Sequence, residues 1–292
     1  MSRPGTRPQH STSSRATAPR RPTLVRTWYL AAALAPLMVA LLAEPLAGQP
    51  IVRIVAYNIR HGEGMDGRVD LERIADVLRA LDADVIALQE VDDRAERTGD
   101  VDQVAVLARL LGYEGFHGPH RAFQGGFYGN AILSRLPVLS METVPVPPAG
   151  GSALAVLEVV VDLTPSGPPT TPLAIVSVHL AGSIEERMAQ SESLTNRYTT
   201  SPHPVILAGD FNGVPDDAVV RSLAGSWTVP PKREPVFTYP SVAPSREIDF
   251  MMWRTGTVTG NRRRPFVVIE HRVIEEVLAS DHRPILVVME VR

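Results

Sequence analysis

From residue 51 onward, short apolar runs alternate with amphipathic helical stretches, and this alternation restricts the chain to folds in which helices cover β-sheets. Residues 51–57 and 84–88 have the composition of buried strands. Between them, the apolar residues of segment 69–81 recur at the spacing of a helix that buries one face. The body of the chain is therefore predicted to be an α/β protein.

The rest of the body contains more predicted strands than helices. Strands are predicted at 127–133, 138–144, 153–161, 173–180, 205–208, 248–253, 266–269 and 285–291, and helices at 102–111, 185–196 and 216–223. The proline-rich segment 164–172 is typical of a hairpin-like connection. Because no linker divides these elements, we expect two sheets packed face to face with the helices outside, in one domain over residues 50–292.

Composition excludes several classes of protein. The chain has no cysteine, which excludes disulfide bonds, thiolate zinc sites and cysteine nucleophiles. No uninterrupted apolar run of at least ~18 residues occurs beyond the N-terminal region, which excludes a polytopic membrane protein. Residues 50–292 carry 23 basic and 31 acidic side chains, and Lys232 is their only lysine. This charge gives no sign of a basic nucleic-acid-binding face.

The N-terminal region has the layout of an export signal. Residues 1–27 carry six arginines, are rich in Ser, Thr and Pro, and are predicted to be disordered. The apolar stretch 28–43 follows them and precedes small residues. We predict that residues 28–49 are a signal peptide cleaved near Ala47 or Gly48, which makes the body periplasmic or extracellular. The alternative is an uncleaved anchor that associates the protein with a membrane.

Polar residues occur at the ends of several predicted strands or inside them. They are Asn58, Glu90, His179, Asp210, Asn212, Asp249, Asp281 and His282. In open α/β sheets, sites collect at the carboxyl ends of strands, so we expect these residues to converge on one rim. Taken singly, each has a structural interpretation, such as a turn at Asp210 or an ion pair of Asp249 with Arg246 or Arg254. One site explains all of them together.

Three of these residues form an oxygen-only set. Glu90, Asp281 and the amide oxygen of Asn58 are ligands that suit a hard divalent cation, and we predict Mg²⁺ or Mn²⁺. Zinc would require more than two histidines and usually fewer amides.

The remaining residues suit proton transfer and anion binding. His282 beside the Asp249 carboxylate matches an acid or base whose tautomer is fixed by its partner. Asp210 is predicted to orient or deprotonate an attacking water, while His179 and Asn212 donate hydrogen bonds to an anionic substrate oxygen. A metal ion, an oriented water and donors to an oxyanion are what in-line attack at phosphorus requires.

Seven short motifs carry a family resemblance. They are Tyr57-Asn58-Ile59, Leu88-Gln89-Glu90, Gly129-Asn130-Ala131-Ile132-Leu133-Ser134-Arg135, Ser177-Val178-His179-Leu180, Gly209-Asp210-Phe211-Asn212, Ile248-Asp249-Phe250 and Ser280-Asp281-His282. This ordered series resembles the endonuclease/exonuclease/phosphatase superfamily, which includes deoxyribonucleases, abasic-site endonucleases, neutral sphingomyelinases and inositol polyphosphate 5-phosphatases. The resemblance covers residues 51–291, the whole predicted body.

The resemblance implies a four-layer αββα sandwich of two mainly antiparallel sheets flanked by helices. It also implies that Asn58 and Glu90 hold Mg²⁺, that Asp281 lies close to the metal, and that Asp249 pairs with His282.

For the substrate, the resemblance implies that Asp210 and Asn212 flank the attacked phosphate and that His179 stabilises its oxygen. Asn130 fits the phosphate-side strand of the family. Whether Asp210 or His282 is the general base stays open.

The substrate is predicted less sharply than the reaction. The loop that follows Glu90 carries Arg94 and Arg97, which we predict to bind a second phosphate or a lipid head group, with a solvated charged loop as the alternative. We expect an exported Mg²⁺-dependent phosphodiester or phosphomonoester hydrolase that acts on a lipid head group or small phosphoester, without an obligate protein partner. The alternatives are an exported DNA or RNA nuclease and a non-catalytic, membrane-tethered binding module.

Overall fold

The computed structural model describes residues 50–164, 171–257 and 266–291. The predicted disordered segment 1–27, the predicted signal or anchor segment 28–49 and most of the connection 164–172 lie outside these residues. Within the described residues, none of the helices combines the length and the apolar character needed to span a bilayer.

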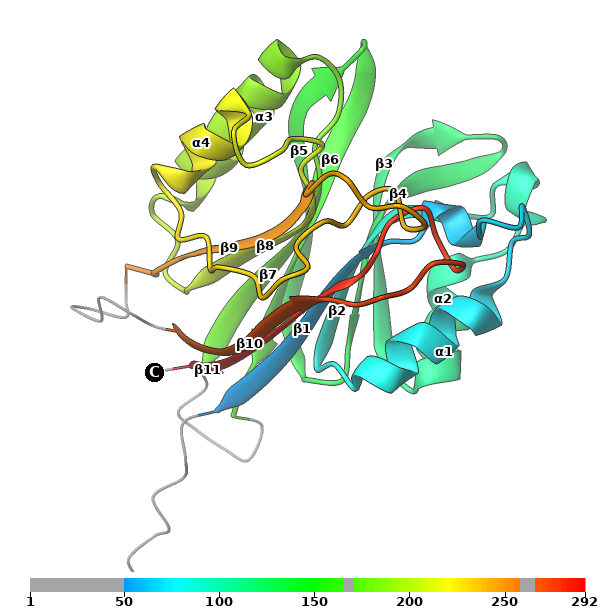
Figure 1. Cartoon of the computed structure of the whole chain (residues 1–292), viewed down its shortest axis with the longest axis horizontal. Helices are drawn as coiled ribbons and strands as arrows, with labels where there is room; N and C mark the ends of the chain where they lie inside the picture. The colour runs from blue at the N-terminus through cyan, green and yellow to red at the C-terminus, as the bar shows by residue number, and fades with distance from the viewer. Residues whose placement is uncertain (1–49, 165–170, 258–265, 292) are drawn as a thin grey trace, which may run out of the picture. The chain divides into compact units, whose positions relative to one another are not determined.

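The first sheet has six strands (Figure 1). Their order is β10 (Phe266–Val273), β11 (Ile285–Val291), β1 (Ile51–Asn58), β2 (Val85–Asp93), β4 (Gly126–Ser134) and β3 (Glu114–Phe123). The central pair β1–β2 is parallel, and the other neighbours are antiparallel.

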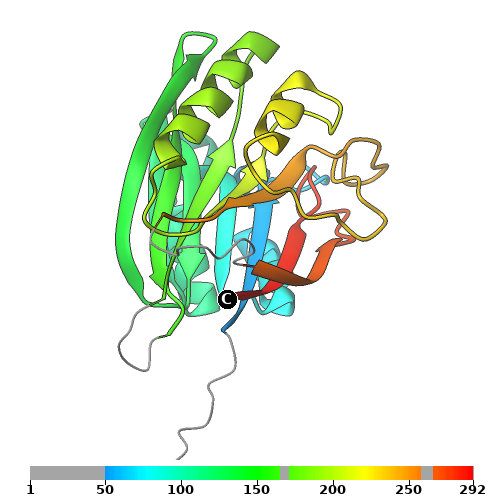
Figure 2. The ribbon, with the colours of Figure 1, turned by 90° about the vertical axis from the view of Figure 1, so that its left-hand side faces the viewer.

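The second sheet has five strands (Figure 2). Their order is β5 (Val138–Ala149), β6 (Ser152–Asp162), β7 (Pro172–His179), β8 (Val205–Asp210) and β9 (Asp249–Arg254). Here β7 and β8 are parallel, and the other neighbours are antiparallel. The prediction of two mainly antiparallel sheets is confirmed.

Helices cover the outer face of each sheet (Figure 1). Helices α1 (Leu71–Leu81) and α2 (Gln103–Leu111) pack on the first sheet through one apolar cluster. Helices α3 (Ile184–Tyr198) and α4 (Ala218–Ala224) pack on the second sheet through another. A third apolar cluster fills the space between the sheets. The four layers predicted from the sequence are therefore present.

The helices begin where side chains can satisfy their first backbone N–H groups. The carboxylates of Asp70 and Asp102 accept from the third residue after each, at 2.9 Å in both cases, and so cap α1 and α2. At α3, Ser183 and Glu186 form a reciprocal capping box. These caps place the helix starts within about two residues of the positions that the sequence predicts.

Strand β3 was not predicted from the sequence. Its segment contains two glycines and a proline, residues that weaken a strand pattern. Gly118 has a packing reason in the tertiary structure, because a Cβ at this position would lie 2.6 Å from the Leu157 Cβ of the other sheet. Strand β2 is also longer than predicted and continues past Glu90 through a bulge between Leu88 and Val91.

Candidate active site

The parallel strand pairs of both sheets end at the same place. The side chain of Asn58, the last residue of β1, donates from Nδ2 to Glu90 Oε1 at 3.0 Å and to Asp210 Oδ2 at 3.2 Å. Glu90 belongs to β2 of the same sheet, whereas Asp210 ends β8 of the second sheet. The predicted convergence of strand-end residues is therefore present, and Asn58 joins the two sheets across it.

The two sheets approach each other closely beneath the site. Gln89 Nε2 donates to Ser177 Oγ at 2.9 Å, and this hydroxyl donates to the Leu88 carbonyl at 2.8 Å. Gly209 has a φ of +148°, and a Cβ there would lie 2.0 Å from the Val178 carbonyl oxygen. Only glycine fits at this crossing, so the motif glycine before Asp210 has a steric cause.

Two site residues have backbone angles that L-residues rarely adopt. Glu90 has a φ of +58°, at the bulge of β2, and Asn212 has a φ of +50°. Such conformations cost about 1–3 kcal/mol each and persist where the surroundings fix them. At Asn212 the surroundings are visible: its N–H donates to Asp210 Oδ1 at 2.8 Å and its Nδ2 to the Leu180 carbonyl at 2.9 Å.

Asp210, Asp249 and His282 form a buried cluster. His282 Nδ1 lies 3.0 Å from Asp249 Oδ2, and its Nε2 lies 3.7 Å from Asp210 Oδ2. His179 approaches the same Asp210 oxygen with Nε2 at 3.6 Å. Asp210 and Asp249 are only 1% and 2% exposed, so solvent screens these charges weakly. Asp249 is thus paired with His282, and the alternative of an ion pair with Arg246 or Arg254 is wrong.

The cluster favours a positive His282. Burial lowers the pKa of His282, but the adjacent Asp249 carboxylate and then Asp210 outweigh it and raise the pKa to about 10. Burial and repulsion from Asp249 raise the pKa of Asp210 above the usual aspartate range. At neutral pH, His282 is therefore a hydrogen-bond donor on both ring nitrogens. Asp210 is more basic than an ordinary aspartate, which suits proton acceptance.

Of the predicted metal-binding residues, Glu90 and Asp281 are more exposed than this cluster, whereas Asn58 is fully buried. Burial raises the pKa of Glu90, but His179, Asn58 and His282 outweigh it, so the pKa lies below the usual range and the carboxylate is ionised. Asp281 is 26% exposed at its side chain, and its Oδ2 lies 3.9 Å from Arg60 Nε.

The carboxylates of Glu90 and Asp210 both lie beside the Asn58 amide, and such oxygen donors fit a hard divalent cation. Asn58, however, turns its amide nitrogen toward the carboxylates, and its oxygen accepts from the Arg60 N–H at 3.1 Å. Ligation through the Asn58 oxygen would require the amide to turn over. Asp210, Asp249 and His282 form a separate group. Their potential ligand atoms all lie within 4.8 Å of one another.

Asn130 lies buried between the two sheets. It is completely buried, and its Nδ2 donates to the Ser177 carbonyl at 3.0 Å and to the Ala155 carbonyl at 3.3 Å. Both acceptors belong to the second sheet, whereas Asn130 lies in β4 of the first. Through its amide nitrogen Asn130 joins the two sheets, and its predicted contact with the substrate stays a prediction.

The two arginines predicted to bind the substrate are held by neighbouring acids. Arg97 donates through Nε and Nη2 to both oxygens of the fully buried Asp92, at 2.8 and 2.9 Å. Arg94 lies 3.0 Å from Asp93 and 3.1 Å from Asp102. The bidentate Arg97–Asp92 pair has the geometry of a structural contact. Binding of a substrate anion by Arg94 and Arg97 stays a prediction.

Sequence reasoning missed the irregular segment between α4 and β9, which contacts His282. The Tyr239 ring centre lies 4.9 Å from that of His282. The Thr238 hydroxyl accepts from the Asp249 N–H at 3.3 Å. Lys232 is buried, with Nζ 2.6 Å from Glu247 and bonded to the Asp249 carbonyl. The one sequence signal for this segment is that Lys232 is the only lysine of residues 50–292.

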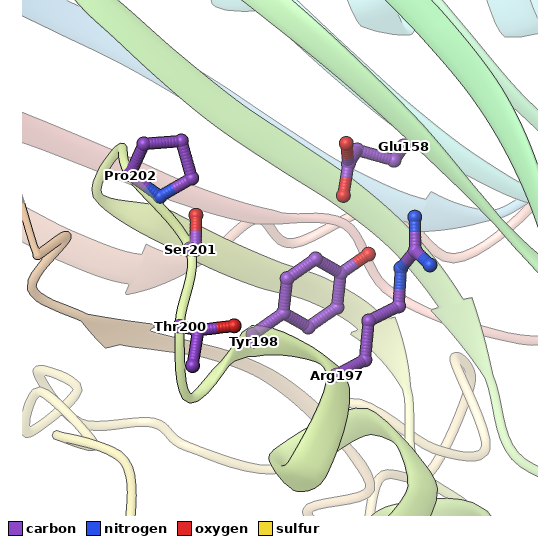
Figure 3. A pocket seen from close by; sticks show the side chains of 6 residues that line it. All are labelled: Glu158, Arg197, Tyr198, Thr200, Ser201 and Pro202. Carbon is purple, nitrogen blue, oxygen red and sulfur yellow. The ribbon is translucent and has the colours of Figure 1, made fainter.

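A cavity of about 260 Å³ lies at the C-terminal end of α3 (Figure 3). Its lining residues are Glu158, Arg197, Tyr198, Thr200, Ser201 and Pro202. The tyrosine hydroxyl, the arginine and the glutamate point toward one another in Figure 3. This cavity adjoins the segment before β8, at the opposite end of that strand from Asp210.

Comparison with known proteins assigns the chain to one family. A model of the endonuclease/exonuclease/phosphatase family matches residues 55–282. The chain belongs to this family. The members of this family are hydrolases of the nuclease and phosphatase type and generally depend on a divalent metal.

Individual relatives agree with this assignment. The uncharacterized protein YbhP of Escherichia coli is 30% identical over 172 residues, which are 55% of this chain and 66% of YbhP. An endonuclease/exonuclease/phosphatase from Beutenbergia cavernae is 24% identical, with 83% of this chain and 72% of that chain covered and a TM-score of 0.62. Humanized TDP2 from D. rerio is 22% identical, with 82% and 98% covered and a TM-score of 0.64. The two structures share the fold.

Proposed function

We propose that this family member is a Mg²⁺- or Mn²⁺-dependent hydrolase of phosphodiester or phosphomonoester bonds. One observation carries the proposal: a buried Asp210–His282–Asp249 cluster lies beside Glu90 and Asn58 at the shared end of both sheets. A proton acceptor, a cationic donor and a set of oxygen ligands meet there. A non-catalytic binding module would have no need of the pKa shifts that this cluster produces.

In the proposed reaction, water attacks phosphorus and the bond to the leaving oxygen breaks. Asp210 accepts the proton of the attacking water, since its pKa is raised and its carboxylate lies at the centre of the site. Protonated His282, oriented by Asp249, donates a hydrogen bond to the oxygens on which negative charge develops. His179 is positioned to donate to the same oxygens. Asp210, not His282, is therefore the proposed general base.

A divalent ion held by Glu90, Asp281 and a turned Asn58 would supply Lewis-acid polarisation of a phosphoryl oxygen. The fold positions the residues that would hold this ion: Glu90 lies at the bulge of β2, and the Ser280 hydroxyl donates to the Asn58 carbonyl at 2.7 Å. This bond ties the segment that carries Asp281 to the end of β1.

As the substrate class, we propose a lipid head group or another small phosphoester. The net charge of −8 over residues 50–292 leaves few cations to neutralise a nucleic acid backbone. Arg94 and Arg97, beside the site, are already paired with carboxylates. A structure with a similar fold, D. rerio TDP2, is described in complex with a single-strand DNA product. The test must therefore distinguish a hydrolase of small or lipid phosphoesters from a nuclease.

We also propose that the protein is exported, through the arginine-rich segment and the apolar stretch of residues 1–49. Fractionation with N-terminal sequencing tests this point. A mature start near residues 48–51 in the exported fraction supports cleavage, and an intact N-terminus in membranes supports an anchor. Intact protein in the cytoplasm contradicts both.

The function is tested by a parallel screen of the purified protein with Mg²⁺. The substrates are bis-p-nitrophenyl phosphate, sphingomyelin, phosphoinositides, plasmid DNA and an abasic duplex. We expect turnover of small or lipid esters with a shallow salt dependence. Efficient DNA cleavage that falls by orders of magnitude from low to physiological salt would instead establish the nuclease alternative. No turnover of any of them would contradict the proposal.

A further inference from the structure

A cavity of about 220 Å³ opens beside the active site, with His179 in its wall. Its other lining residues are His120, Arg121, Tyr128, Ala149, Ser152, Ala153, Leu154 and Ala181. They come from the β3–β4 hairpin, the β5–β6 turn and the segment after β7. Because His179 also lies 3.6 Å from Asp210, this cavity adjoins the place where the scissile phosphate is proposed to bind.

The cavity has the polarity of an anion site. Its lining, over the residues that the structure describes, includes an arginine and no carboxylate. The Arg121 guanidinium lies 5.2 Å from the Tyr128 ring centre and 5.8 Å from that of Phe123. In the described part of the chain, no acid lies within ion-pair distance of it, in contrast to Arg94 and Arg97. A guanidinium held against aromatic rings keeps its in-plane N–H donors available.

A second polar group in the wall is unsatisfied. His120 is only 7% exposed, and its Nε2 has no hydrogen-bond partner among the described residues. An unpaired buried nitrogen costs free energy unless a ligand or water satisfies it. Burial, with repulsion from His179 and Arg121, lowers the pKa of His120 to about 3, so the ring is neutral. His120 therefore contributes no positive charge to the cavity, whereas Arg121 contributes one.

Size and rigidity limit the ligand. About 220 Å³ is room for roughly seven water molecules at ~30 Å³ each, which suits a phosphate and its linking atoms. It is smaller than the ~300–1,000 Å³ of pockets that enclose drug-sized ligands. The β5–β6 turn is fixed in place, because the Gly150 N–H donates to Glu186 Oε1 at 2.7 Å and Glu186 is held by the capping box of α3.

We propose that this cavity binds a second anionic group of the substrate, a phosphate joined to the scissile phosphoester, through Arg121 and the unpaired nitrogen of His120. The inference rests on the proposed function and deepens it. It assigns to Arg121 the role that the sequence predicts for Arg94 and Arg97. The same chemistry is offered by a soluble bisphosphorylated ester and by a phosphorylated lipid head group.

The first test is binding of inorganic phosphate, measured by calorimetry in the presence of a chelator. The wild-type protein is expected to bind with an affinity of about millimolar, and Arg121→Gln is expected to weaken it at least tenfold. His120→Ala weakens it by a smaller factor. Arg109→Gln, which removes an exposed arginine from α2, is the matched control and keeps the wild-type affinity. Equal affinity in the wild type and Arg121→Gln overturns the proposal, as does a loss in Arg94→Gln alone.

The binding of inorganic phosphate is measured without turnover. It therefore tests the proposed anion binding in the cavity separately from the proposed hydrolase activity. The second test is kinetic, with glycerophosphoinositol 4-phosphate in solution and phosphatidylinositol 4-phosphate in mixed micelles. A rise in KM of at least tenfold in Arg121→Gln in the soluble arm alone identifies a free ester, and in the micelle arm alone a lipid head group. The same KM as the wild type in both arms overturns the assignment of the cavity to the substrate.

Discussion

Each sheet has one parallel strand pair at its centre, β1–β2 in the first and β7–β8 in the second, and both pairs end at the active site. The first sheet brings Asn58, which is fully buried, and Glu90, which is half-buried and in a strained conformation. The second brings Asp210 and, from β9, Asp249, both almost fully buried. The two sheets thus have similar topology but support different chemistry. The half with Glu90 and Asp281, here called the open half, suits an ion and substrate. The half with Asp210, Asp249 and His282, here called the buried half, suits proton transfer.

His282 shows that the division follows environment and not chain order. It precedes β11 of the first sheet, yet its imidazole joins the two aspartates of the second. The same loop leaves Asp281 on the open side, near Arg60. Two consecutive residues thus serve the two halves, and the experiments below ask whether the halves are separable.

The largest effect is expected from removing the metal from the open half. A chelator should reduce hydrolysis of bis-p-nitrophenyl phosphate to background, because no side chain replaces a divalent charge at the phosphoryl oxygens. Added Mg²⁺ or Mn²⁺ should restore it. Glu90→Gln should raise the metal concentration needed for half-maximal activity, and Glu72→Gln on α1 serves as control. Full activity in chelator would remove the distinction between the halves.

Next in size is the loss of the proton acceptor from the buried half. Asp210→Asn should lower kcat by about 10²–10⁴, the usual contribution of a general base, because an amide cannot take a proton from water. Metal affinity, measured by calorimetry, should change less than in Glu90→Gln. The exposed Asp216 provides the control Asp216→Asn. If Asp210→Asn has a lower metal affinity but the wild-type kcat at saturating metal, Asp210 belongs to the open half.

A smaller effect, about 10²-fold at pH 8, is expected from Asp249→Asn. Asp249 raises the pKa of His282, so its neutralisation lowers that pKa and the imidazolium is lost at a lower pH. In the wild type, activity that needs the imidazolium is retained up to about pH 10 and declines above it. In the variant, this alkaline decline moves toward neutral pH. A pH–rate profile measures it, with the exposed Asp66→Asn as control.

The opposite profile would reassign the general base. If His282 acts as the base, wild-type activity rises as pH approaches 10, and Asp249→Asn shifts the rise to lower pH. A double variant Asp249→Asn/His282→Ala should be little worse than His282→Ala alone if the two act as a unit.

The smallest effect is expected at the rim. Arg97→Gln leaves the buried Asp92 carboxylate without its partner and should lower the free energy of unfolding by roughly 1–3 kcal/mol. Denaturant titration measures it, and Arg109→Gln is the control. If Arg97 binds the substrate, Arg97→Gln should instead raise KM and leave stability unchanged, which would support the prediction made from the sequence.

The sequence by itself determined most of the elements, though not β3, and most of the residues at the shared strand ends. Apolar runs located β1, β7 and β8, and capping residues such as Asp102 located helix starts, because both patterns depend on near neighbours in the chain. Polar residues at strand ends, such as Asp210, pointed to one site because the carboxyl ends of parallel strands meet there.

Only the tertiary structure decided which of those residues face the reaction. Asn130 and Arg97 have the right residue types and lie in or beside the motifs, yet their donors are used by partners that the chain pattern does not specify. Tyr239 and Lys232 lie in an irregular segment and reach His282 and Asp249 only through folding. The physical reason is that a local pattern records burial and backbone conformation, whereas a charge or donor acquires its role from groups brought close by long-range packing.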